Sequence, residues 1–301
     1  MKTRTHFKTR QTKINRLNNI VFIICCATIV NLGCTNQREG YATSFDDSSI
    51  DYTVSGKGEP AIVFIHGGLG CDKRVWENQI SFFEEKYTVV SLSLSGHGKS
   101  ISKRTDYTIE SFGKDVASVV NELELKKVIL VGHSLGGLVS IEAALNLQNE
   151  TLGIIGLDCL NEFELKWSED MIVGFPEWFS TDTEEKIANY IREMFTQETD
   201  SVLIESTAEK FSKVDKFVFA NELDHWFHYQ NEKFISSIQK LDVPVTSIQN
   251  GDNVITTEIN QKYNPNFKGV KLDSLLHFFI ISYPEIVNAE IESALQGFID
   301  I

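Results

Sequence analysis

The stretch VILVGHSLGG, residues 128–137, decides the fold that we expect for this chain. Four aliphatic residues lead into Gly-His-Ser-Leu-Gly, and an apolar, helix-like segment (138–147) follows at once. A buried strand that turns this sharply into a helix holds its serine at the apex of the turn. The backbone there is too crowded for a Cβ at the neighbouring positions, which explains the flanking glycines. Ser134 is therefore the candidate nucleophile, and the N–H of Leu135 is expected to face the same point.

Strands and helices alternate on both sides of this turn. Residues 50–54 alternate apolar and polar side chains, as a half-buried strand does. Further strands are expected at residues 61–65, 87–94, 152–157, 243–248 and 269–272. Helical stripes occupy residues 109–123 and 284–298. The pattern predicts an α/β fold with a mostly parallel central sheet and helices on both of its faces.

The segment 161–237 departs from this alternation. It lacks short buried apolar runs, is rich in charged and aromatic residues, and has helical periodicity. We expect a helical cap here, inserted into a core made of residues 49–160 and 238–301. Its rings should mostly join cap helices to one another, and some should line an apolar pocket. The cap aromatic residues are Trp167, Phe175, Trp178, Phe179, Phe195, Phe211, Phe217, Phe219, Trp226, Phe227 and Tyr229.

A serine hydroxyl needs an adjacent base, and in this architecture the chain order is serine, acid, histidine. Most of the seven histidines lie before the fold, in glycine turns upstream of Ser134, in the turn itself or in the insertion; these are His6, His66, His97, His133, His225 and His228. His277 alone follows the last expected strand. It is the candidate base.

Several short motifs together resemble the α/β-hydrolase fold superfamily. They are HGG (66–68), SGHGKS (95–100), GHSLGG (132–137), His277-Phe278 and Pro284-Glu285, in that family's order and spacing. The resemblance covers residues 50–300 outside the insertion. It implies that His277 is the general base, that Gly68 and Leu135 supply the backbone N–H groups of an oxyanion hole, and that His66 and His97 brace their turns. No cofactor is expected, and no Cys-x-x-Cys or Cys/His spacing indicates a metal site.

The acid of the triad is open to two assignments. Asp252 is favoured because it is the only carboxylate between the strand 243–248 and Glu258. The family often has its aspartate one residue later, where this chain has Asn253. An acid after the preceding strand, Asp158 or Glu162, is the alternative that the resemblance allows.

The chain of 301 residues has a net charge of −14, with six basic and no acidic side chains in residues 1–33. The remainder carries 22 basic and 42 acidic side chains, a net charge of −20. So acidic a body repels nucleic acid and anionic lipid headgroups, which argues against phosphate-backbone partners.

The N-terminus is typical of an export signal. A basic segment precedes the apolar run 20–30, which is short for a bilayer span. Gly33-Cys34 follows and resembles the lipobox of bacterial lipoproteins, although Asn31 stands where an aliphatic residue is usual. This predicts a signal (1–33), lipidation at Cys34, a polar tether (34–48) and a membrane-anchored exported protein. An uncleaved signal anchor, or cleavage at another position, is the alternative. Cys71 and Cys159 are expected to be buried and apolar.

The leading functional hypothesis is a serine hydrolase that cleaves a small or medium apolar carboxylic ester, or a related lactone or amide. Haloalkane dehalogenases and epoxide hydrolases of this fold use an aspartate at the position of Ser134, so the serine argues against both. A carbon–carbon bond hydrolase or a cofactor-free haloperoxidase-type enzyme is the alternative. A non-catalytic binding protein is the third, and the apparent presence of a complete triad disfavours it. The sequence does not indicate an oligomeric state.

Overall fold

The computed structural model describes residues 37–251, 255–273 and 275–299. Across these residues the strands form one eight-stranded sheet in the order β1-β2-β4-β3-β5-β6-β7-β8. The first two strands pair antiparallel, as do β2 and β4, and the other neighbouring pairs are parallel. The strands are β1 (Arg38–Thr43), β2 (Ser49–Ser55), β3 (Ala61–Ile65), β4 (Thr88–Leu92), β5 (Val128–His133), β6 (Thr151–Leu157), β7 (Val245–Asn250) and β8 (Lys268–Leu272). The predicted α/β class with a mostly parallel sheet is confirmed.

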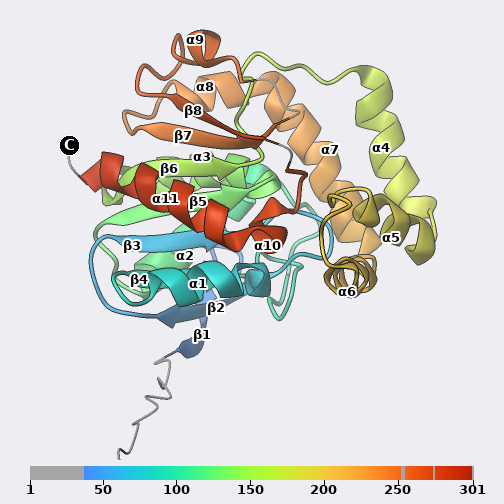
Figure 1. Ribbon diagram of the computed structural model, residues 1–301, viewed down its shortest axis with the longest axis horizontal. Helices are drawn as coiled ribbons and strands as arrows, with labels where there is room; N and C mark the ends of the chain where they lie inside the picture. The colour runs from blue at the N-terminus through green and yellow to red at the C-terminus, as the bar shows by residue number, and fades with distance from the viewer. Residues whose placement is uncertain (1–36, 252–254, 274, 300–301) are drawn as a thin grey trace, which may run out of the picture. The chain divides into compact units, whose positions relative to one another are not determined.

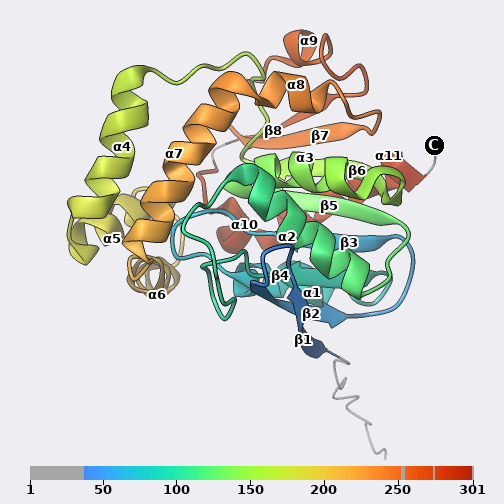
Figure 2. The same cartoon turned by 180° about the vertical axis from the view of Figure 1, so that it is seen from behind.

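The helices cover both faces of the sheet, as Figures 1 and 2 show from opposite sides. They are α1 (Glu77–Phe83), α2 (Ile109–Glu122), α3 (Leu135–Leu147), α4 (Glu169–Thr181), α5 (Glu184–Arg192), α6 (Ser201–Phe211), α7 (Lys216–Glu232), α8 (Phe234–Ile238), α9 (Thr257–Asn260), α10 (Phe279–Ser282) and α11 (Pro284–Ile299). Helices α1 and α11 lie on one face, and α2 and α3 lie on the other.

The central strands are buried on both faces, which explains their unbroken apolar sequences. Strand β3 places Val63 and Ile65 in the core beneath α2 and α3, while Ile62 and Phe64 belong to the core on the α1 and α11 side. All four side chains are fully buried. The sheet is therefore a rigid platform from which the loops at its carboxyl edge project.

Between β6 and β7 the chain is helical, and α4 to α7 stand beyond one end of the sheet (Figure 1). Each of these four helices begins at a side-chain N-cap: Ser168, Thr183, Asp200 and Asp215 accept hydrogen bonds from backbone N–H groups of the first turn. Such caps stabilise a helix end by about 1 kcal/mol each. The helices α4 and α7 pack against each other through aromatic rings, including Phe175 against Phe227.

Residues 38–43 differ from the expected polar tether (34–48), because they form the edge strand β1. This strand pairs with β2, with Arg38 opposite Val54 at one end and Thr43 opposite Ser49 at the other. Most of its side chains are exposed or half-buried, as is usual for an edge strand, and this polar composition concealed it. The expected signal and Cys34 lie outside the described residues. Of the helices that the structure describes, none has both the length and the apolar character needed to cross a bilayer.

Candidate active site

The candidate residues meet at the carboxyl edge of the sheet. Gly68 follows β3, Ser134 follows β5, Asp158 follows β6, and His277 lies between β8 and α10. Carboxyl ends of parallel strands share one edge, which is where open α/β sheets bind ligands. Asp252 lies outside the described residues.

Ser134 lies between β5 and α3 with φ 54° and ψ −123°, a conformation that L-residues rarely adopt. Its N–H donates to the Leu157 carbonyl at 3.0 Å, which ties the turn to β6. The sharp turn requires glycine at position 132, because a Cβ there would lie 2.1 Å from the Gly136 carbonyl oxygen. The sequence thus forces a strained turn that holds the serine above the sheet edge.

His277 is held by Asp158. Its Nδ1–H donates to Asp158 Oδ2, in a contact between a carboxylate that is 5% exposed and a ring that is 25% exposed. The other carboxylate oxygen, Oδ1, accepts a hydrogen bond from Asn250 Nδ2 at 2.7 Å. The described residues therefore pair the candidate base with one of the two alternative acids. Glu162, the other alternative, lies on the wall of an adjoining cavity.

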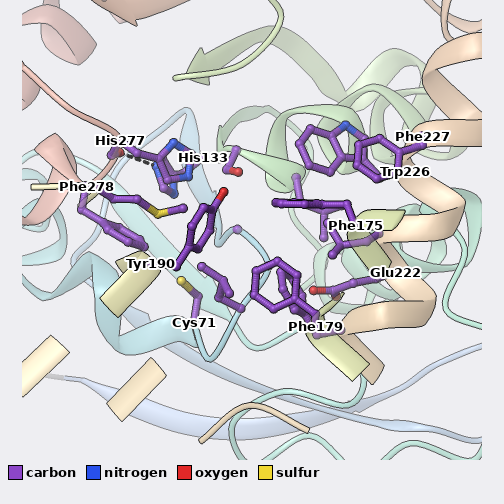
Figure 3. Close-up of a pocket in the computed structure, with 18 of the residues that line it drawn as sticks. Cys71, His133, Phe175, Phe179, Tyr190, Glu222, Trp226, Phe227, His277 and Phe278 are labelled. Atoms are coloured by element: carbon purple, nitrogen blue, oxygen red, sulfur yellow. Dashed lines mark hydrogen bonds between the residues drawn. The ribbon is translucent and has the colours of Figure 1, made fainter. Parts of the chain in front are cut away.

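His133 supports His277 from below. Its Nε2–H donates to the His277 backbone carbonyl at 2.9 Å, a hydrogen bond drawn as the dashed line in Figure 3. The centroids of the two imidazole rings are 4.6 Å apart. Burial, followed by the charge of His277, lowers the pKa of His133 to about 3. His133 therefore stays neutral at physiological pH and adds no positive charge beside a protonated His277.

The backbone amides of Leu135 and Gly68 are the expected oxyanion donors. Leu135 is the first residue of α3, where N–H groups have no partner inside the helix. Gly68 belongs to the loop after β3 and lines the same cavity as Ser134. His66 braces this loop, because its Nδ1–H donates to Gly67 and its Nε2 accepts from the Leu94 N–H at 2.9 Å. Burial, then the charge of His97, lowers the pKa of His66 to about 3.

Ser134, Leu135, Gly68 and His277 open into a cavity of about 340 Å³ between the sheet edge and the cap. Its wall is mainly apolar, and rings of α4, α5 and α7 surround the cavity in Figure 3. The cap rings that line it are Trp167, Phe175, Phe179, Tyr190, Phe219, Trp226 and Phe227. Other predicted cap aromatics do not line the cavity. Phe195 and Phe211 pack against Phe278, whereas Phe217 is exposed.

Burial raises the pKa of the Cys71 and Cys159 thiols, so both stay protonated at neutral pH. Cys71 is buried as predicted, whereas Cys159 is only partly buried.

Two residues of this site had no place in the sequence analysis. Asn250, the last residue of β7, orients Asp158. Glu222 of α7 brings a carboxyl group to the cavity wall. A glutamate within the apolar stripe of a cap helix is the signal that could have revealed it, since Phe219, Leu223 and Trp226 occupy the same face.

A family model described as alpha/beta hydrolase fold matches residues 60–281. The 3-oxoadipate enol-lactonase 2 of Acinetobacter baylyi is 32% identical over 93 residues, which are 31% of this chain and 34% of that protein. The bifunctional esterase/perhydrolase of Acinetobacter calcoaceticus is 33% identical over 99 residues, 33% of this chain and 36% of that protein. The match thus spans about a third of the length of these curated relatives.

The solved structure of an esterase from Exiguobacterium antarcticum has a TM-score of 0.76 at 16% identity and covers 86% of this chain and 100% of its own. At this identity the likeness concerns the fold. The sequence relatives support a hydrolase. The segment that the family model matches includes the candidate serine, Asp158 and His277. The chain belongs to the alpha/beta hydrolase fold family.

Proposed function

We propose that the protein is a serine hydrolase that cleaves a small or medium apolar carboxylic ester, or a related lactone, through an acyl-enzyme on Ser134. The observation that carries the proposal is the pairing of His277 with the buried Asp158 carboxylate, beside a cavity that Ser134 shares. A histidine held at Nδ1 keeps Nε2 for proton transfer, which is what an activated serine needs.

In the acylation step, Ser134 Oγ attacks the carbonyl carbon and its proton moves to His277 Nε2. The carbonyl oxygen becomes an oxyanion, which the Leu135 and Gly68 amides stabilise; one such donor is worth about 10²–10³ in kcat. The C–O bond then breaks, and the alkoxide leaves with the proton from His277. Asp158 keeps the ring oriented and stabilises the imidazolium while it exists.

Water repeats the sequence. His277 takes a proton from water, the resulting hydroxide adds to the acyl carbon, and Ser134 leaves with that proton as the acid is released. The neutral His133 lies beside the ring without opposing its transient charge. The mainly apolar wall favours substrates whose groups next to the carbonyl are apolar.

Labelling with a fluorophosphonate probe tests the nucleophile. We expect the full chain to be labelled and Ser134→Ala to be silent, with Ser140→Ala, a buried serine of α3, as the control that retains labelling. An unlabelled wild-type protein would contradict an activated serine.

A series of 4-nitrophenyl esters of increasing acyl length tests the cavity. The rate of hydrolysis should fall once the acyl group outgrows the cavity, and a flat profile near background would argue against an esterase.

The acid is tested by comparing Asp158→Asn with Asp252→Asn. We propose Asp158 because it contacts His277 Nδ1, and the alternative predicts that the loss of activity follows substitution of Asp252.

Export and lipidation at Cys34 remain proposals that rest on the sequence. Mass spectrometry of the protein made in a bacterium should find an acylated Cys34 as the first residue, and an intact Met1 would end that proposal.

A further inference from the structure

Glu222 is a buried carboxyl group that the proposed mechanism does not use. It projects from α7 into the wall of the active cavity, as Figure 3 shows, and its side chain has no exposure to solvent. One oxygen, Oε2, lies 2.9 Å from His97 Nε2. The other, Oε1, has no hydrogen-bond partner within the part of the chain that the structure describes. A buried polar atom left in this state is costly, about 1–3 kcal/mol, unless something else satisfies it.

Oε1 lies beside the loop after β3, which contains the proposed oxyanion donor Gly68. A Cβ on Gly68 would come within 2.7 Å of Oε1, so only glycine lets the carboxyl approach this closely. The Leu69 backbone amide lies close enough to the carboxyl group to lower its pKa, but it makes no hydrogen bond with Oε1. Oε1 therefore lies beside Gly68, the proposed second oxyanion donor, and Glu222 lines the cavity that Ser134 shares.

The hydrogen bonds of His97 determine what Oε1 can do. The Cys71 carbonyl, 3.1 Å from His97 Nδ1, can only accept, so Nδ1 carries a proton. His97 Nε2 then either donates to a Glu222 carboxylate or accepts from a protonated Oε2. In both states the pair is neutral overall, and in both states Oε1 has no proton. Burial raises the pKa of Glu222, and the adjacent His97 opposes that shift.

We propose that Glu222 Oε1 is a specificity determinant that accepts a hydrogen bond from a hydroxyl or amide N–H of the substrate, close to its scissile carbonyl. The site then selects a substrate that is apolar over most of its surface and carries one neutral donor. The proposal rests on the proposed ester hydrolysis, which it deepens. Sites built to hydrogen-bond a substrate group reject analogues that lack it more strongly than apolar pockets reject a size change.

The test compares kcat/KM, followed by proton release, for matched ester pairs. The pairs are 3-hydroxybutyrate and butyrate esters of 4-nitrophenol, 2-hydroxyethyl and propyl butyrate, and 2-acetamidoethyl butyrate and its N-methyl derivative. We expect the donor-bearing partner to be favoured at least about tenfold in one pair. In Glu222→Met the preference in that pair should fall about tenfold or more. A preference below threefold in all pairs, or one that survives in Glu222→Met, overturns the proposal.

Two variants control for shape and folding. Glu222→Gln can donate its amide to His97 Nε2 and still present an oxygen to the cavity, so it should retain the preference. Glu232→Gln, on an exposed side chain of the same helix, should leave it unchanged. If Glu222→Met does not fold, the double variant His97→Leu/Glu222→Met takes its place, since it leaves neither partner unpaired.

Binding to Ser134→Ala separates this proposal from the proposed reaction. Calorimetric titration with the same ester pairs should show the donor-bearing partner binding about tenfold tighter, and Glu222→Met in that background should abolish the difference. If the wild-type enzyme hydrolyses no ester while this difference persists, the reaction is wrong and the role of Glu222 stands. If the wild-type enzyme hydrolyses esters but shows no preference for the donor-bearing partner in rate or in binding, the proposed reaction stands and the role of Glu222 is wrong.

Discussion

Asp158 occupies the first position after β6 with a positive φ of 53°, so its carboxylate turns toward His277 rather than following the strand. We predict that Asp158→Asn lowers kcat by about 10³–10⁴-fold, because an amide cannot hold the productive tautomer of the base. The measurement is steady-state hydrolysis of a 4-nitrophenyl ester. Glu162→Gln is the matched control and should remain near wild type; a similar loss there would indicate a general effect of loop charge.

The buried neutral histidines make stability depend on pH. The pKa of His133 is lowered from 6.5 to about 3, so between these pH values the ring is neutral in the native state and protonated in the unfolded chain. The stability that this group contributes is complete above pH 6.5 and is lost as pH falls toward 3.

His133→Gln keeps an N–H for the His277 carbonyl and does not titrate. We expect urea unfolding at pH 7, 5.5 and 4.5 to show a flatter pH profile for this variant, the difference growing by about 1.4 kcal/mol per pH unit below 6.5. Ser140→Ala, a substitution in α3 that involves no titratable group, is the control and should keep the pH profile of the wild type. Parallel profiles for His133→Gln and wild type would refute the assignment.

Sequence was sufficient to name some residues of the candidate site and insufficient for others. Ser134 could be predicted because its turn has a strict glycine pattern, and His277 because chain order leaves one candidate. Asp158 and Asp252 both follow strands, and the sequence alone does not show that the chain after β6 brings Asp158 to His277. Glu222 approaches the site from the cap, over 120 residues away from its partner His97, a contact that no local pattern encodes.

At the scale of elements, the β5–α3 turn leaves no room for a side chain at position 132. In Gly132→Ala the new Cβ would clash with backbone atoms of α3, so the strand or the helix must move. We predict a loss of stability of about 3 kcal/mol or more in urea unfolding, with loss of activity. Gly174→Ala on α4, where nothing lies within 4 Å, should instead stabilise by about 1 kcal/mol. Equal effects of the two substitutions would contradict this account.

The elements themselves were largely predictable. The strands β3, β5 and β6 are continuous apolar runs, and α2 has a clear helical stripe. The exception, β1, is short, polar and at the sheet edge, so its sequence resembles a linker. The helices α9 and α10 have only four residues each and too few turns to show a periodicity.

At the scale of the whole molecule, the acidic charge should affect which esters reach the cavity. Residues after position 33 carry a net charge of −20. We predict that kcat/KM for an anionic ester, such as a 4-nitrophenyl succinate monoester, rises about two- to fivefold as salt increases from 0.02 to 0.3 M, since screening weakens repulsion. 4-Nitrophenyl butyrate, which is neutral, is the control. An equal salt response for both esters would mean that long-range charge has no effect on association.

The joint between core and cap has a mechanical consequence. The chain leaves the sheet for the cap immediately after β6, and Asp158 is the first residue of that joint. The backbone of this joint is held by the core, because the Asp158 N–H donates to the Ile248 carbonyl of β7 at 2.9 Å and the Asn161 carbonyl accepts from the Thr256 N–H at 3.1 Å. A rotation of α4 to α7 would therefore bend the chain beyond Asn161, and the base would keep its orientation whether the cap is open or closed.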